Sequence, residues 1–516
     1  MANRGWIIGI TAILTITSVG FFLFARDPYS EAEIQRLVNG AYNAQRPGGG
    51  RLSGASFTPA GTSSAPIQGP GRAQLLLLRM PNSPTRQRLQ ALVHLAGGEW
   101  KKFIDVANNA TLPYSNDEAI ANNLGASYLA LSETDPTLLL KAIDAFEQAL
   151  RSNPNAPEPL FNLVVAYRKL RFQKLASEAF NRYSALDAES AWHSELANPH
   201  QLDEAAILDQ LQQAVENEDL VEAERLFQAN AELCRRAAMQ YALSGDTEST
   251  ALMQFIADQM ERYYGDLTIS AMIAPLTTEA RAISLTIRVY VNEGAAEYDK
   301  GNWGKSIAAY NKATRLARQT DSLIDRLWID LNQVNTQIRL GEFEEVSATL
   351  SRLIRLATKH RLAWLAAKAK SVYVATLRIS SSYTEMLDLL SQADSDFIRL
   401  DAPQDRIRVL YYLAAYRYYA GDQEEGLRLA LECLRLINED DAVRIATLDW
   451  LIGSILYRRG MPEKSLIFAK ESFEQSHKGP YANGIEFLAA ITLAELYESM
   501  SKHTLADEYL TVASEA

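Results

Sequence analysis

The side chains best suited to nucleophilic or metal chemistry are two cysteines and six histidines, and both sets are scattered along the chain. Cys234 and Cys433 each lie in a predicted helix with no second Cys or His at ligand spacing nearby, which favours buried packing residues over a reactive or metal-bound thiol. None of the histidines belongs to an H-E-x-x-H pair; they are His94, His193, His200, His360, His477 and His503. These residues predict no catalytic centre, no metal site and no cofactor.

Two other patterns resemble catalytic motifs only in part. Gly304-Lys305-Ser306 copies the end of a phosphate-binding loop, but Asp299 stands where the first glycine of that loop should be. Carboxylate pairs such as Glu344-Glu345 fall at predicted helix starts, where negative charge suits the helix dipole. The net charge of -12 argues against nucleic acid as a partner. We therefore expect a chain that is not an enzyme and has no small-molecule substrate.

The elements that carry these residues are predicted to be repeated helical pairs. From Leu75 onward the apolar residues recur with helical spacing. The steps from Ala142 to Ala176 and from Phe146 to Phe180 are equal, at about 34 residues, which is the length of a tetratricopeptide unit. The order of small and aromatic residues is also typical of such units. We expect an N-terminal array of them over residues 73–200.

The second half of the chain repeats with a longer period, of about 40 residues. The alignment rests on small residues at predicted turns between the two helices of each unit: Gly301, Gly341, Ser381, Gly421, Gly460 and Ser501. Stacked helical pairs of this kind bury a shared core. The predicted fold is therefore an all-α, tetratricopeptide-type superhelix, or α-solenoid, with a C-terminal array over residues 286–516 and an irregular helical linker repeat over residues 201–285.

The N-terminal residues have a different composition. Residues 5–25 are uncharged and apolar, and a helix of that length crosses roughly 30 Å of hydrocarbon. We expect a transmembrane anchor over residues 1–26, with a cleaved signal peptide as the alternative. Residues 27–72 are expected to form a short helix and then a flexible Gly/Pro/Ser-rich linker. These features predict a single-pass protein, in a bacterial inner membrane, with its repeats outside the cytoplasm.

Several stretches between Arg51 and Leu316 resemble the N-terminal half of bacterial CHAT proteins, which join a tetratricopeptide array to a caspase-like peptidase domain. The most telling are RLSGASFTP, LVHLAGGEW and CRRAAMQYALSGDTESTALMQFIADQMERYYGD. The repeats of this chain continue to within a few residues of Ala516, so the peptidase half is not matched. The resemblance implies a scaffold that acts with a separately encoded, peptidase-like effector.

The first helix of each C-terminal unit is predicted to line a concave groove that binds a segment of a partner protein. Its outward positions carry Arg, Tyr and Trp, which are enriched at binding hot spots, although long amphipathic side chains also cover apolar helix surface. The predicted partner-binding residues are Arg288, Tyr298, Arg339, Arg378, Arg408, Tyr411, Tyr418, Trp450, Tyr457 and Arg458.

The predicted function is thus that of a membrane-anchored protein–protein interaction scaffold. The alternative is the sensor half of a CHAT-type proteolytic system whose peptidase domain is lost or separately encoded.

Overall fold

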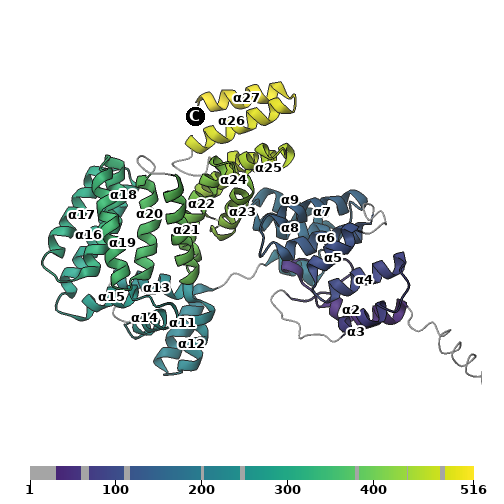
Figure 1. The fold of residues 1–516 in the computed structure, drawn as a ribbon, viewed down its shortest axis with the longest axis horizontal. Coiled ribbons are helices and arrows are strands. Elements are labelled where there is room, and N and C mark those ends of the chain that lie inside the picture. The colour runs from purple at the N-terminus through teal and green to yellow at the C-terminus, as the bar shows by residue number, and fades with distance from the viewer. Residues whose placement is uncertain are drawn as a thin grey trace, which may run out of the picture. The chain divides into compact units, whose positions relative to one another are not determined.

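The computed structural model describes residues 31–59, 69–109, 117–198, 203–244, 250–377, 383–438, 440–476 and 483–515. Within these ranges the regular secondary structure is helical, without strands (Figure 1). The prediction of an all-α helical-repeat fold is confirmed. The chain divides into two compact units, residues 1–200 and residues 201–516.

The first unit places helical pairs after a short N-terminal group of helices. Its helices are α2 (Glu31–Asn43), η1 (Pro47–Gly49), α3 (Gly69–Leu77), α4 (Pro84–Ala96), α5 (Trp100–Asn109), α6 (Glu118–Leu131), α7 (Leu138–Ser152), α8 (Pro157–Lys169), α9 (Gln173–Asp187) and α10 (Ala191–Ala197). In the α6–α7 pair, a Cβ on Gly125 would lie 2.5 Å from the ring of the buried Phe146. The close approach of the two helices explains why this position is glycine.

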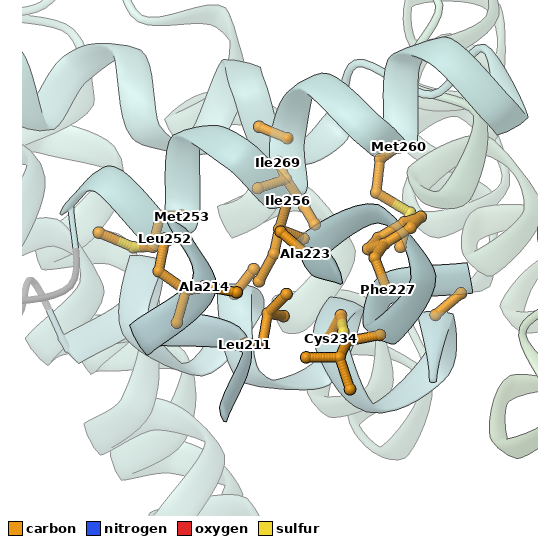
Figure 2. Close-up of a cluster of buried hydrophobic side chains, with 14 of the residues drawn as sticks. Leu211, Ala214, Ala223, Phe227, Cys234, Leu252, Met253, Ile256, Met260 and Ile269 are labelled. Atoms are coloured by element: carbon orange, nitrogen blue, oxygen red, sulfur yellow. The ribbon is translucent and has the colours of Figure 1, made fainter. Parts of the chain in front are cut away.

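The second unit begins with helices of irregular length that share a core of their own. They are α11 (Glu204–Glu216), α12 (Leu220–Ala229), α13 (Ala231–Ser244), α14 (Thr250–Tyr264), α15 (Thr268–Ile273) and η3 (Ala274–Thr277). Figure 2 shows Leu211, Phe227, Cys234, Ile256 and Met260 converging between these helices, and all five are buried. The buried cluster holds α11 to α15 together.

The remaining helices form successive pairs. They are α16 (Arg281–Asp299), α17 (Trp303–Ala317), α18 (Leu323–Leu340), α19 (Phe343–Lys359), α20 (Ala363–Leu377), α21 (Tyr383–Arg399), α22 (Pro403–Tyr419), α23 (Gln423–Leu436), α24 (Ala442–Arg458), α25 (Pro462–Ser476), α26 (Asn483–Ser499) and α27 (His503–Glu515). The turn glycines take the positive φ that leaving a helix favours, for example +84° at Gly341 and +87° at Gly421. Ser381, a further predicted turn residue, lies outside the described residues.

A repeated hydrogen bond ties the two helices of a pair together. The hydroxyl of Ser306 donates to the carbonyl oxygen of Gly294 at 2.7 Å, and that of Ser465 donates to Gly453 at 2.7 Å. In each case the serine follows the glycine by 12 residues. These serines and glycines are therefore contact points between paired helices.

The segment from α13 to α15 lies against the turns that join successive repeats. The Leu267 amide donates to the carbonyl oxygen of Arg361 at 2.9 Å, and the Trp364 amide donates to Oδ1 of the buried Asp266 at 3.2 Å. The Arg399 guanidinium donates to the carbonyl oxygen of Tyr264 at 3.3 Å. This segment therefore packs on the C-terminal array along one edge of the repeats.

The membrane prediction requires correction. Among the helices that the structure describes, none has both the length and the apolar character needed to cross a bilayer. The predicted transmembrane segment, residues 5–25, lies outside the described residues. This finding contradicts the prediction of a single-pass membrane protein with a membrane localisation.

The expected Gly/Pro/Ser-rich linker also differs from the structure in part. Residues 46–58 are held against α6, α8 and α10 by hydrogen bonds, which the glycine-rich composition does not suggest. Residues 60–68 lie outside the described residues.

Candidate functional site

The first helices of the C-terminal repeats line two adjoining cavities. The first cavity, of about 450 Å³, lies between α20, α22, α23 and α24. It is lined by Lys368, Gln404, Asp405, Ile407, Arg408, Tyr411, Tyr412, Cys433, Ile437, Arg444, Thr447 and Leu448. More of these side chains come from α22, the first helix of its repeat, than from any other helix.

The second cavity, of about 550 Å³, continues from the first along α20, α18 and α16. Its other wall is α13, from the irregular segment. The lining residues are Glu232, Arg235, Arg236, Met239, Gln240, Leu243, Ser244, Asn292, Trp328, Trp364, Gln404 and Asp405. Because Gln404 and Asp405 line both cavities, we treat the two as one trough and call it the C-terminal trough.

The trough is built on one position of the repeat. Trp328, Lys368 and Arg408 all line it, and they occupy equivalent positions in three successive units. Each lies on the first helix of its unit, at the same interval before the turn residue that ends this helix. The repeat register therefore projects these three side chains to the same face of the array.

Asp405 organises the polar contacts where the cavities meet. Its Oδ2 accepts a hydrogen bond from the Trp364 indole nitrogen at 2.6 Å, and its Oδ1 pairs with the Lys368 ammonium. Trp364 stacks on Trp328 with ring centroids 6.3 Å apart. The contacts fix two aromatic rings and one cation side by side on the wall of the trough.

The Trp328 indole leaves a buried donor unused. Its Nε1 is buried and has no hydrogen-bond partner among the described residues, although the side chain as a whole is half-buried and lines the second cavity. Such a donor is stabilised when a ligand acceptor reaches it.

Basic side chains outnumber acidic ones in the trough. The basic side chains are Arg235, Arg236, Lys368, Arg408 and Arg444, and the acidic ones are Glu232 and Asp405. This balance is opposite to that of the whole chain, whose net charge is -12. Arg408 is exposed and has no ion-pair partner in the described part of the chain. The other four basic side chains pair with Glu232, Asp405, Glu204 and Asp441. Arg408 is therefore the side chain through which the trough attracts negative charge most directly.

Glu232 titrates within the physiological range. Burial, with a smaller contribution from the nearby Asp405 charge, raises the pKa of its carboxyl to about 7, although Arg235 and Arg236 oppose the shift. The ion pair with Arg235, at 2.7 Å, does not offset the burial. Near neutral pH, proton uptake by Glu232 makes the trough more positive.

Of the predicted partner-binding residues, Arg408 and Tyr411 line the trough. Four more of the predicted residues form two contacting pairs near the C-terminal ends of the first helices, close to the turns. The Arg339 guanidinium donates to the Tyr298 hydroxyl at 3.4 Å, and the Arg458 guanidinium lies 4.4 Å from the centroid of the Tyr418 ring. These pairs join neighbouring repeats and lie outside the residues that line the trough.

The remaining predicted residues are dispersed. Arg288 is 2% exposed and donates to the carbonyl oxygen of Met272 at 2.6 Å, so it ties α16 to the irregular segment. Tyr457 packs against the buried cluster of the last repeats, and Trp450 is half-buried on α24. Arg378 lies outside the described residues.

Most of the residues that line the trough were not predicted from the sequence. Trp328 and Lys368 could have been found, because they share the repeat register with Arg288 and Arg408, both of which were selected. The α13 residues could not, because their approach to the repeats depends on contacts distant in sequence, such as the hydrogen bonds from Arg235 to the carbonyl oxygens of Leu400 and Asp401.

Both cysteines are buried, as predicted. Burial raises the pKa of each thiol to about 12. The thiols are therefore protonated at neutral pH, and a nucleophilic role would require the thiolate. Within the described ranges, no cluster of three or more His, Cys, Asp or Glu side chains is placed to hold a metal ion.

Comparison with known proteins adds little to this description. No family model matches the chain, and no curated protein matches it. A Rap protein in complex with Competence and Sporulation Factor aligns with a TM-score of 0.35 and 13% identity, over 61% of this chain and 97% of that one. The apo form of RapI aligns with a TM-score of 0.34 and 12% identity, over 60% of this chain and 96% of that one. Likenesses at this level carry no argument about function.

Proposed function

We propose that the C-terminal trough binds an acidic segment of a partner protein and that recognition, not catalysis, is the function of the array. The observation that carries the proposal is Arg408, an exposed cation without an ion-pair partner among the basic side chains that line the trough of an otherwise acidic chain. Charge complementarity of this kind speeds encounter and selects among partners.

The trough also offers apolar anchoring sites. The stacked rings of Trp328 and Trp364, together with Met239 on the facing helix, provide surface for an aromatic or aliphatic side chain. The Trp328 indole N–H, which has no partner among the described residues, and the exposed Arg408 can donate hydrogen bonds to a carbonyl or carboxylate of the bound segment. We expect the bound segment to combine Asp or Glu with at least one large apolar residue.

The partner is identified here by its chemistry alone. The predicted peptidase-like effector and the relationship to CHAT proteins find no support in the comparisons. A carboxylate-bearing segment of any protein fits the trough as well as one from such an effector.

Selection from a random peptide library on the purified chain tests the proposal. We expect the selected peptides to be enriched in Asp and Glu next to an apolar residue, and to bind more weakly as salt is raised. Enrichment of basic or uncharged peptides, with no salt dependence, would contradict the assignment of the trough as a site for acidic segments.

A further inference from the structure

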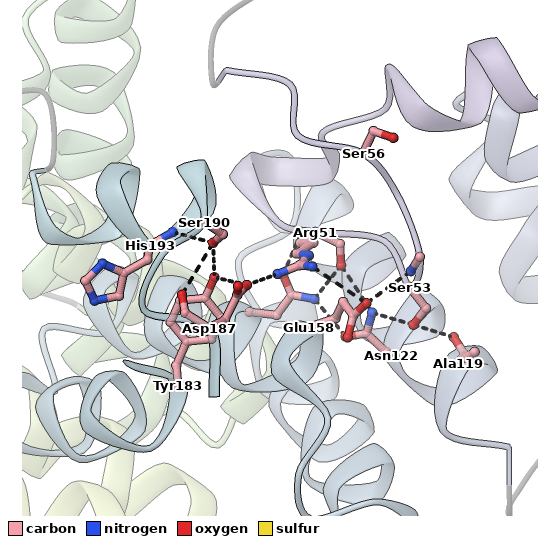
Figure 3. Close-up of polar contacts among 12 residues, drawn as sticks. Arg51, Ser53, Ser56, Ala119, Asn122, Glu158, Tyr183, Asp187, Ser190 and His193 are labelled. Atoms are coloured by element: carbon pink, nitrogen blue, oxygen red, sulfur yellow. Dashed lines mark hydrogen bonds and ion pairs between the residues drawn. The ribbon is translucent and has the colours of Figure 1, made fainter. Parts of the chain in front are cut away.

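A segment of the chain without α-helix covers one face of α6 and α8, which we call the inner face. Residues 46–58, which we call the N-terminal strap, follow α2 and cross α6, α8 and α10. Figure 3 shows Arg51 and Ser53 of the strap lying over Asn122 and Glu158. The strap thus covers the first helices of two N-terminal repeats, α6 and α8.

The repeats bind the backbone of the strap through side-chain amides. The Arg51 amide donates to Asn162 Oδ1 at 2.6 Å, and Asn162 Nδ2 donates back to the Arg51 carbonyl oxygen at 2.8 Å. Asn122 donates to the same carbonyl oxygen at 3.1 Å. The Ser53 amide donates to Asn123 Oδ1 at 2.9 Å. Contacts of this kind recognise the peptide backbone rather than the side chains of Arg51 and Ser53.

The asparagines occupy a repeated position on the inner face. Asn122 and Asn162 lie on the first helices of consecutive units, and both are fully buried. Buried asparagines inside helices are unfavourable unless their amides are hydrogen-bonded. Here they are bonded to one another and to the strap. The strap therefore satisfies side-chain amides that the repeats would otherwise leave buried without a partner.

The arginine side chains of the strap meet acidic and aromatic groups on the repeats. The Arg51 guanidinium pairs with Asp187 at 2.9 Å and approaches Glu158 at 3.9 Å. The Arg46 guanidinium pairs with Glu195 and lies 4.5 Å from the centroid of the Trp192 ring. This acidic and aromatic wall selects arginine.

Apolar contacts between the strap and the repeats are few. Leu52 and Ala55 are buried, and Phe57 meets Trp192 edge to face with ring centroids 5.1 Å apart. Gly50 is needed because a Cβ there would lie 2.9 Å from the side-chain oxygen of a groove asparagine. Polar contacts therefore hold most of the strap, and water can replace them when it leaves.

We propose that the inner face of α6 and α8 is a binding site for an arginine-bearing peptide, and that the strap is its tethered occupant. A partner peptide with the pattern of residues 50–53, which is glycine, arginine, an apolar residue and a small polar residue, displaces the strap and takes over its contacts. The proposal does not depend on the C-terminal trough, which recognises the opposite charge. Because the strap is covalently attached, it competes at a high effective concentration.

The test uses the full chain and a fluorescent peptide with the sequence of residues 46–58, RPGGGRLSGASFT. Fluorescence anisotropy compares its affinity for the wild type, for Arg51→Ala, which weakens the strap, and for Arg51→Ala with Asn162→Ala, which also damages the groove. We expect Arg51→Ala to bind the peptide about tenfold or more tightly than the wild type, because the strap loses a charge-assisted contact. The double variant should lose this gain.

A measurement on the wild type makes the result independent of how the variants fold. Hydrogen exchange at the amides of Arg51 and Ser53 should accelerate when the peptide is added in excess, because each amide donates to a groove asparagine. A control peptide with Glu in place of the arginine that corresponds to Arg51 should not have this effect.

Unchanged exchange in excess peptide, or equal binding to all three proteins, would overturn the proposal and leave the strap a fixed part of the fold. Dimerisation of the wild type at high concentration, without binding of the peptide, would also overturn it, since the occupant would then be the strap of a second copy.

Discussion

Replacing Arg235 by methionine is expected to detach the α13 wall of the trough. Arg235 is 3% exposed and donates to the carbonyl oxygens of Leu400 and Asp401, the latter at 2.7 Å. It also pairs with Glu232 at 2.7 Å. These contacts link α13 to the turn between α21 and α22, so they fix one side of the trough to the repeats.

The loss of stability can be estimated from the buried groups that Arg235→Met leaves without a partner. Methionine preserves much of the apolar stem, but both carbonyl oxygens lose a charged donor and Glu232 loses its nearest cation. Breaking a buried charge pair by removing one partner costs about 3–5 kcal/mol, and each hydrogen bond to a charged group contributes about 1.5–3 kcal/mol. Because these terms overlap, we expect Arg235→Met to lower the free energy of unfolding by about 3 kcal/mol.

The neighbouring arginine provides a matched control. Arg236 has a side chain that is 47% exposed, and it pairs with Glu204 on the surface. Exposed ion pairs contribute about 0–1 kcal/mol. Arg236→Met should therefore change the free energy of unfolding by no more than about 1 kcal/mol. Urea unfolding measures both variants, and hydrogen exchange should show faster opening of α13 in Arg235→Met alone.

Equal stabilities for the two variants would refute the reasoning. So would unchanged exchange of the α13 amides in Arg235→Met, because α13 would then be held to the repeats by other contacts.

Two further predictions concern the core of the C-terminal repeats. Asp449 is fully buried, and burial, with the nearby Glu471 charge, raises the pKa of its carboxyl well above the usual value. Its stabilising contribution is therefore present at low pH and lost as pH rises, so Asp449→Asn should raise the melting temperature at pH 8 and change it little at pH 4. A Cβ on Gly294 would lie 2.7 Å from the Tyr310 ring; overpacking of this kind costs about 1–3 kcal/mol. Gly294→Ala should thus lower stability in urea unfolding, whereas Gly304→Ala, which meets no atom within 4 Å, should not.

The helical part of the fold could be predicted because its determinants are local. Apolar spacing gives helices, and the small residues at Gly301, Gly341 and Gly421 mark turns that require positive φ. The same register would also have indicated Trp328 and Lys368, had it been extended from Arg288 and Arg408 to every repeat.

The rest of the site depends on contacts that no local pattern records. The Gly/Pro/Ser-rich composition of residues 46–58 is typical of a linker, yet asparagines far along the chain hold this segment in place. Arg288 has the residue type of a binding hot spot, but the irregular segment covers it. Periodicity indicates which face of a helix is polar, and only the packing of distant helices decides whether solvent reaches it.

The affinity of a library-selected acidic peptide for two double charge reversals tests the function of the trough most directly. Lys368→Glu with Arg408→Glu reverses two charges within the trough. Arg355→Glu with Lys359→Glu makes the same change on α19, where both side chains are exposed and neither lines the trough. We predict that the trough variant binds at least about tenfold more weakly than the wild type, a loss of about 1.4 kcal/mol or more, and that the α19 variant binds like the wild type. Equal affinities for the two variants would contradict the assignment of the trough as the binding site.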